Sequence, residues 1–245
     1  VYKRQSVHNL AYQGLCSFDW AWQLELPIEL HDLNGAEYHG SISMLKVGLV
    51  LADRITTVSP TYAKEIQSEP GGQGLSGLFR QREHHLSGIL NGLDYAIWNP
   101  NSDPNLTQNF DINSLRLRGK NRQDLLSHYG LEDGVLCAIV SRAATQKGLH
   151  LITEHIDTLI EQRARFIFLA NGQPDIMKML TDCAQRHPQT FRLISEFDPR
   201  IARRLYSGSD YVLVPSLYEP CGLTQMMAMR YGSVPIVRST GGLAD

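Results

Sequence analysis

Residues 215–230 (PSLYEPCGLTQMMAMR) hold the side chains of this chain that are best suited to chemistry. The apolar run at 211–214 before them predicts a strand, and the apolar pattern at 223–231 predicts a helix. Because the first N–H groups of a helix lack partners within it, a strand, a tight turn and a helix start together form an anion site. Glu219 in the turn suits hydrogen bonding to sugar hydroxyls better than to a phosphate. The alternative is an ordinary turn in which Gly222 takes a positive φ and Glu219 is a surface charge.

A second reactive pair, Arg142 and Lys147, lies between a predicted strand and a predicted helix. The planar guanidinium of Arg142 and the compact ammonium group of Lys147, five residues apart, can bind a diphosphate from two sides. Two solvated charges are the alternative, but cations at a helix start oppose the helix dipole, and a bound anion would remove that conflict. The facing turn would add N–H donors and a hydroxyl from Gly222, Leu223 and Thr224. The sequence has no D-x-D carboxylate pair that would hold Mg²⁺ between phosphates.

Strand and helix patterns alternate regularly in the second half of the chain. Strands are predicted at 135–141, 165–169, 190–195, 211–214 and 234–237, and helices at 149–162, 174–186, 199–207 and 223–231. This alternation predicts an α/β fold with a parallel, doubly wound sheet, in which ligands bind beyond the carboxyl ends of the strands. That rule places these residues along one edge: Arg142, Lys147, Gly172, Phe197, Glu219 and Thr240.

The first hundred residues carry weaker signals. Helices are predicted at 43–52 and from Ser59-Pro60 to about 67, strands at 55–58 and within 86–100, and a loop at 69–77. Residues 1–5 and 15–40 fit no element. The polar, proline-punctuated stretch 99–109 predicts a boundary, so we assign one domain to 1–100, a linker to 101–110 and a second domain to 111–245.

Composition narrows the class of protein. A net charge of −2 and a pI near 6.5 give no sign of binding to nucleic acid or to a membrane surface. No apolar run reaches the length of a membrane span, and no signal-peptide pattern opens the chain. The four cysteines are scattered without metal-ligand spacing, which predicts reduced thiols in a cytoplasmic-type compartment.

Six blocks of this sequence resemble bacterial glycogen synthases and plant starch synthases, in the family's order. They are SVHNLAYQG from Ser6, TVSPTYAKEI from Thr57, GILNG from Gly88, QKG from Gln146, YEPCGLTQ from Tyr218 and TGGL from Thr240. The resemblance implies the GT-B fold, with two Rossmann-like domains and an active site between them. It also implies a retaining transfer of glucose from ADP-glucose to the non-reducing end of an α-1,4-glucan, without a metal or another cofactor.

The resemblance also assigns roles by position. Arg142 and Lys147 would bind the diphosphate, and Glu219 would hold hydroxyls of the transferred glucose, with His8 closing on that glucose from the first domain. For a lone histidine such as His8, a structural role is the alternative. The implied catalytic residues are therefore Glu219, His8, Arg142 and Lys147. The implied substrate-binding residues are Asn9, Asn91, Phe197 (near the adenine), Cys221, Gly222, Leu223, Thr224, Thr240 and Gly241.

Two departures from the family matter. Met227 stands where many GT-B enzymes carry a glutamate that contacts the ribose. The family's Lys-x-Gly-Gly-Leu loop and the elements after its TGGL block lie outside these 245 residues, so we expect an internal fragment with little or no synthase activity alone.

Two other functions stay open: a GT-B transferase that uses UDP-glucose, and a non-catalytic relative that binds glucan. A bacterial cytoplasm is the expected location, with a plastid as the alternative, and the oligomeric state is left open.

Overall fold

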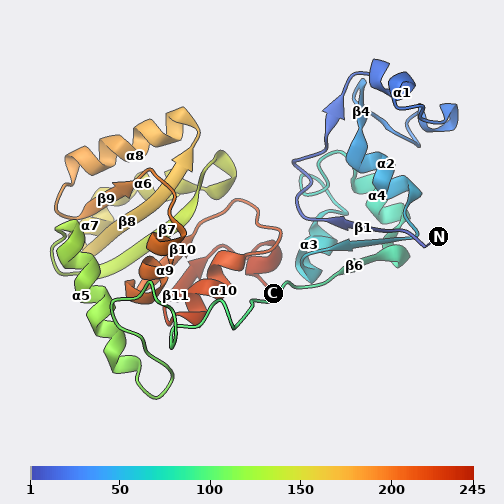
Figure 1. Cartoon of the computed structure of the whole chain (residues 1–245). Helices are drawn as coiled ribbons and strands as arrows, with labels where there is room; N and C mark the ends of the chain where they lie inside the picture. Colours follow the sequence, from blue (N-terminus) through green and yellow to red (C-terminus); the bar gives the residue numbers. More distant parts are fainter. Residues whose placement is uncertain (1) are drawn as a thin grey trace. The chain divides into compact units, whose positions relative to one another are not determined.

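The computed structural model describes residues 2–245, which form two compact units. Unit 1 comprises Val1–Asn91, Glu219–Cys221 and Thr240–Asp245, and unit 2 comprises Gly92–Tyr218 and Gly222–Ser239. Figure 1 labels most of the helices and strands of each unit. Residues 101–110, which we predicted as a linker, lie within unit 2.

Unit 1 is built on a parallel sheet in the order β1-β5-β6, formed by β1 (Arg4–Val7), β5 (Arg54–Thr57) and β6 (Leu86–Gly88). Its core joins these strands to α2 (Met44–Leu51), α3 (Pro60–Glu65) and α4 (Ser76–Gln81) through buried side chains such as Leu49, Ile55 and Phe79. The 3-10 helices η2 (Glu83–His85) and η5 (Gly241–Leu243) complete this part.

A smaller antiparallel sheet in unit 1 joins β2 (Leu15–Cys16), β4 (Ser41–Ser43) and β3 (Glu37–Tyr38). With α1 (Asp19–Gln23) and η1 (Ile28–Leu30), it encloses a small core around Ala21, Ala36 and Ile42. Our prediction that residues 15–40 form no regular element was wrong, as was the same prediction for Arg4 and Gln5 in β1. These elements are short or polar, so they lack the periodicity on which the prediction depended.

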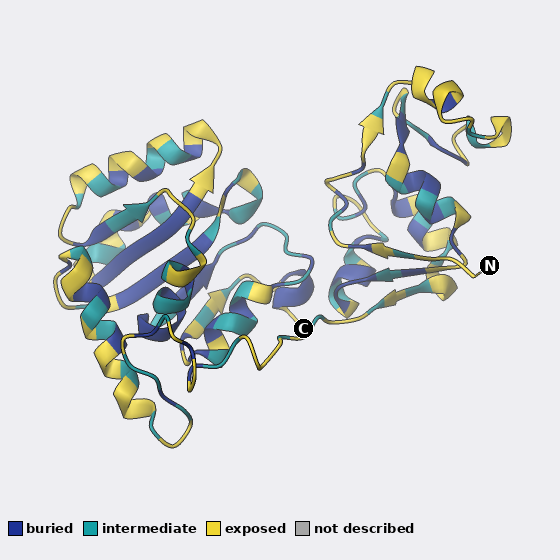
Figure 2. Cartoon of the chain, viewed as in Figure 1, coloured by how far each residue is buried: buried dark blue, intermediate teal, exposed yellow. Residues whose placement is uncertain are grey.

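Unit 2 contains a parallel sheet in the order β11-β10-β7-β8-β9. The strands are β7 (Val135–Ala143), β8 (Ala164–Gly172), β9 (Phe191–Ile194), β10 (Tyr211–Val214) and β11 (Val234–Val237). This arrangement confirms the predicted α/β class with a parallel, doubly wound sheet. Figure 2 shows β7 and β8 buried along most of their length, as expected for strands covered on both faces.

Helices lie on both faces of this sheet (Figure 1). On one face α6 (Leu149–Thr153), α7 (Ile156–Glu161) and α8 (Pro174–Arg186) pack on a core that includes Phe166, Phe168 and Phe191. Helix α9 (Pro199–Gly208) contacts β7 and β8, and α5 (Arg118–Tyr129) packs on α9. Helix α10 (Leu223–Arg230) contacts β10 and β11. The 3-10 helices η3 (Leu115–Leu117) and η4 (Thr145–Lys147) precede α5 and α6.

The strand order fixes where a ligand can bind in unit 2. The chain runs outward from β7 to β8 and β9, and then returns to place β10 on the other side of β7. The connections after β7 and β10 therefore leave the sheet in opposite directions, and the space between them is the switch point at which open α/β sheets bind ligands.

Candidate functional site

Arg142 lies at the carboxyl end of β7, beside this switch point. We predicted it in a loop after residue 141, but β7 continues to Ala143, because Arg142 and Ala143 stay in register with Asn171 and Gly172 of β8. Ala143 is buried, whereas the side chain of Arg142 is exposed. The longer strand therefore fixes the backbone of Arg142, while its side chain is exposed.

The loop after β7 is tied to the loop after β10. The Leu217 N–H donates to the Gln146 carbonyl at 2.8 Å, and Gln146 Nε2 donates to the Tyr218 carbonyl at 3.0 Å. Gly148 has a φ of +64°, and a Cβ on it would lie 2.1 Å from the Pro215 carbonyl oxygen. Only glycine fits this contact, which places Lys147 next to the 215–218 segment.

On the other side, α8 supports the same loop. Gln173 Oε1 accepts from the Thr145 N–H at 2.9 Å and from Thr145 Oγ1 at 3.1 Å. The Gln173 N–H in turn donates to the Ala143 carbonyl at 2.7 Å. The segment that carries Lys147 is thus fixed at both ends by hydrogen bonds to other parts of unit 2.

The start of α10 forms the opposite side of the switch point. Gly222, at the N-cap, has a φ of +80°, which confirms the positive φ considered for it. Leu223 and Thr224 supply the first-turn N–H groups that have no acceptor within the helix. Thr224 also forms a hydrogen bond with Tyr206. Burial raises the pKa of Tyr206 to about 12, although the hydrogen bond with Thr224 acts in the opposite direction. Tyr206 is therefore a neutral hydroxyl beside the helix start.

A cavity of about 490 Å³ opens at this edge of unit 2. Three of the predicted residues, Arg142, Phe197 and Thr224, line it together. Most of the remaining lining is apolar and includes Met227. The residues that sequence reasoning did not predict here include Trp98, Asn171 and Tyr206. The position of Asn171 could have been inferred, because it lies near the carboxyl end of β8, the neighbour of β7, whereas nothing in the sequence indicated Trp98.

The predicted residues of unit 1 occupy its loops. His8 is exposed directly after β1, and Asn9 Oδ1 accepts from the Ala11 N–H at 3.0 Å in a local turn. Asn91 Nδ2 donates to Cys221 Sγ at 3.0 Å, which joins two of the predicted residues.

The remaining predicted residues of unit 1 belong to the segments 219–221 and 240–245. Glu219 is half-buried, and its carbonyl accepts from the Gly242 N–H at 2.9 Å. Thr240 Oγ1 and the Gly241 N–H both donate to Glu65 Oε1, at 3.0 and 2.9 Å. The predicted set thus falls into one group in unit 1 and one in unit 2, the latter being Arg142, Lys147, Phe197, Gly222, Leu223 and Thr224.

Comparison with known proteins decides the family. The starch synthase catalytic domain family matches residues 4–81, and glycosyl transferases group 1 matches residues 134–245. The glycogen synthases of Granulibacter bethesdensis and Methylocella silvestris are 46% and 43% identical to this chain, over 98% of its length. A solved structure of the catalytic domain of starch synthase IV from Arabidopsis thaliana, bound to ADP and acarbose, matches 99% of this chain with a TM-score of 0.91 and 34% identity. The chain belongs to the glycogen and starch synthase family.

The family resemblance and the GT-B fold inferred from sequence are therefore confirmed. The chain spans about half the length of the curated glycogen synthases it matches, 50% in the two cases above, and 51% of the starch synthase IV chain.

Residues 2–245 offer neither a metal-binding cluster nor a membrane-spanning helix. This part of the chain contains no group of three or more His, Cys, Asp or Glu side chains that could hold a metal ion. No helix within the same residues is long and apolar enough to cross a membrane.

Proposed function

We propose that this chain carries the donor site of a retaining glucosyltransferase that moves glucose from ADP-glucose to the non-reducing end of an α-1,4-glucan. The observation that carries the proposal is the geometry of unit 2, in which Arg142, the Lys147 loop and the start of α10 surround one switch point. Membership of the glycogen and starch synthase family supports the same reaction.

The diphosphate of the donor is assigned to the cationic side of this site. Arg142 offers a planar fork of N–H donors and Lys147 a compact charge, and the first-turn N–H groups of α10 complete an anion cradle. Phe197, exposed above the cavity, is assigned to the adenine.

The glucose of the donor is assigned to the other group of residues. Glu219 would bind hydroxyls of the transferred glucose, and His8, Asn9 and Asn91 would contact it from the first Rossmann-like domain. Cys221, Leu223, Thr240 and Gly241 are assigned to the donor as further substrate-binding residues.

The chemistry follows from how charge develops. Breaking the anomeric C–O bond puts negative charge on the leaving diphosphate and positive charge on the sugar. Arg142, Lys147 and the start of α10 would stabilise the negative charge, at about 3 kcal/mol for each well-aimed donor. The acceptor hydroxyl attacks on the face that the diphosphate leaves, and a diphosphate oxygen takes its proton. Trapping of a glucosyl group on Glu219 would refute this same-face route.

We expect the donor and the glucan to be the partners of the chain, without a metal, another cofactor, nucleic acid or a membrane. We also place the chain in a bacterial cytoplasm, since its cysteines are unpaired thiols and the two glycogen synthases compared above come from bacteria.

A chimeric enzyme tests the proposal. This chain would replace the matching half of the Granulibacter bethesdensis glycogen synthase, which it covers over 242 aligned residues. We expect the folded chimera to incorporate labelled glucose from ADP-glucose into glycogen, and Lys147→Ala or Glu219→Ala to abolish most of that incorporation. A folded chimera that uses only UDP-glucose would favour the other GT-B reaction. Full activity after Lys147→Ala would exclude the proposed role of the cradle.

A further inference from the structure

Trp98 is a part of the cavity wall to which no role has been assigned. It lies between β6 and η3, in a stretch without regular secondary structure, yet it lines the same cavity as Arg142, Phe197 and Thr224. Its ring lies 6.4 Å from that of Tyr206, another lining residue. A side chain from an irregular segment needs external support to hold one position in a binding wall.

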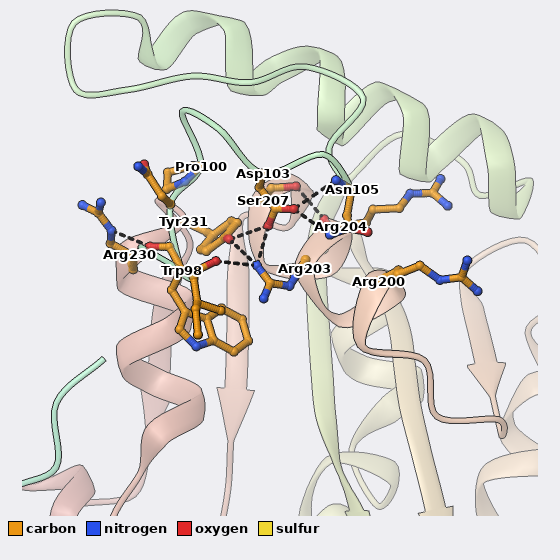
Figure 3. A network of polar contacts seen from close by, with 12 residues as sticks. Trp98, Pro100, Asp103, Asn105, Arg200, Arg203, Arg204, Ser207, Arg230 and Tyr231 are labelled. Carbon is orange, nitrogen blue, oxygen red and sulfur yellow. Dashed lines mark hydrogen bonds and ion pairs between the residues drawn. The ribbon is translucent and has the colours of Figure 1, made fainter. Parts of the chain in front are cut away.

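Two arginines from different helices supply that support (Figure 3). Arg203 of α9 places its Cζ 4.3 Å from the centre of the Trp98 ring and donates to the Ile97 carbonyl at 2.8 Å. Arg230 of α10 donates through Nε to the Trp98 carbonyl at 2.9 Å. The backbone of residues 97 and 98 and one face of the indole are therefore all held.

Asp103 anchors this arrangement. Its side chain is fully buried, and Oδ2 accepts from Arg203 Nη1 at 2.8 Å and from the Tyr231 hydroxyl at 2.5 Å. Burial opposes ionisation, but the hydrogen bonds from Tyr231, Arg203 and Asn105 outweigh it and lower the pKa of Asp103. A buried carboxylate with these partners permits few alternative positions for Arg203, because leaving either charge unpaired is costly.

We propose that Trp98 is a donor-binding residue that contacts the base of the nucleotide, and that Asp103 and Arg203 are positioning residues that hold its indole in the cavity wall. This inference rests on the proposed function, since it assigns the base to the cavity beside the diphosphate cradle. Trp98 and Phe197 add two aromatic side chains to that of Tyr206 in the cavity lining, and aromatic rings bind bases through their faces. Met227 offers no carboxylate to the ribose, so contact with the base carries more of the affinity for the nucleotide.

The inference predicts a preference for purines. A purine presents a larger face than a pyrimidine, so the indole contributes more to the binding of ADP than of UDP. It contributes nothing to inorganic pyrophosphate, which occupies only the cradle. Titrating the intact chain with these three ligands therefore separates contact with the base from general damage to the site.

Calorimetric titration of Trp98→Ala gives the first test. Because stacking of one base on an aromatic ring is worth roughly 1–3 kcal/mol, we expect the Kd of ADP to rise about tenfold or more, with little change for pyrophosphate. Trp98→Phe keeps an aromatic face and should stay within about threefold of the unmodified chain. The matched control is Trp22→Ala, which removes a tryptophan of unit 1 that is 68% exposed.

The positioning role is tested on α9. Arg203→Met removes the support of Trp98, and we expect it to weaken the binding of ADP but not the binding of pyrophosphate. Arg200→Met is the control, because Arg200 lies on the same helix, is exposed and pairs with Asp198. In a Trp20→Phe, Trp22→Phe background Trp98 is the single remaining tryptophan, so ADP should change its fluorescence and pyrophosphate should not.

The outcomes separate this inference from the function on which it rests. If the unmodified chain binds no ADP, both are overturned. Two results with a chain that binds ADP would overturn only the role of Trp98. In the first, Trp98→Ala leaves the Kd of ADP unchanged. In the second, it raises the Kd of ADP and the Kd of pyrophosphate by the same factor. Equal effects of Arg203→Met and Arg200→Met would overturn the positioning role.

Discussion

Replacing Gly148 with alanine would place a methyl group where the two loops of the donor site meet. The added Cβ would lie 2.1 Å from the Pro215 carbonyl oxygen, inside the distance at which backbone atoms can coexist. Because that oxygen belongs to the backbone, relief requires the 215–218 segment to move away. The hydrogen bonds of Gln146 to Leu217 and Tyr218 would then be lost.

The cost has two parts. A non-glycine residue at a φ of +64° costs about 1 kcal/mol. The loss of the two hydrogen bonds costs about 1 kcal/mol each. We therefore expect Gly148→Ala to lower the unfolding free energy of unit 2 by about 3 kcal/mol, which corresponds to a fall in Tm of about 6–12 °C. Displacement of the loop that carries Lys147 should also weaken the binding of ADP.

Gly130→Ala provides a matched control. Gly130 has a φ of +62°, but the nearest atom to its added Cβ would be Arg192 Nη2 at 3.9 Å, so only the backbone strain remains. Differential scanning calorimetry should therefore show a fall in Tm about one third as large for Gly130→Ala, and ADP should still bind. Equal falls for the two variants would refute the proposed tie between the loops.

Two other substitutions test single contacts. Asp103→Asn should destabilise unit 2 by about 3–5 kcal/mol at neutral pH, because it leaves Arg203 without its buried partner. The pKa of Asp103 is lowered in the folded chain, so this contribution is present above the unfolded-state pKa of about 3.9 and is lost as the pH falls through the folded-state value. In urea unfolding, the difference between Asp103→Asn and the unmodified chain should shrink below about pH 4, and a difference that is constant down to pH 2 would contradict this. Glu65→Ala removes the acceptor of Thr240 and Gly241, so the Gly241 amide should exchange hydrogen faster, and unchanged exchange would contradict the contact.

The elements best predicted from the sequence have strong local signals. Helix α8 and the strands β10 and β11 begin and end at the predicted residues, since apolar runs there are bounded by turn residues. Ser43 and Ser59 were consistent with helix starts, and their hydroxyls accept from the Lys46 and Tyr62 N–H groups at 3.1 and 2.8 Å. Local chemistry determined these boundaries, so the sequence was sufficient.

Other elements depend on partners that are distant in the sequence. Helix α5 was not predicted, because its sequence is mostly polar and only Asn121, Leu125 and Leu126 are buried. The helix predicted at 149–162 is two helices, α6 and α7, that are separated at residues 154–155. Neither helix α5 nor the break between α6 and α7 can be recognised from the residues that are neighbours in the sequence.

The segment around Trp98 shows the same limit at the candidate site. Its polar and proline-rich composition is typical of a linker, yet Asp103 is buried against Arg203, and Asn109 Nδ2 donates to the Pro100 and Asp103 carbonyls. The partner of Asp103 lies 100 residues further along the chain. Arg142 and Phe197 could be placed at one edge from the sequence, because the edge rule for parallel sheets applies to them, and Thr224 could be placed in the facing turn, whereas Trp98 could not be placed.

Calorimetric titration of ADP into this chain tests the central claim, a diphosphate cradle in unit 2, most directly. We expect one ADP to bind per chain, and Lys147→Ala to raise its Kd about tenfold to a hundredfold, since a hydrogen bond to a charged group contributes roughly 1.5–3 kcal/mol. Lys178→Ala, an exposed lysine of α8, should bind ADP like the unmodified chain in the same salt. No binding of ADP, or equal binding by the two lysine variants, would contradict the account.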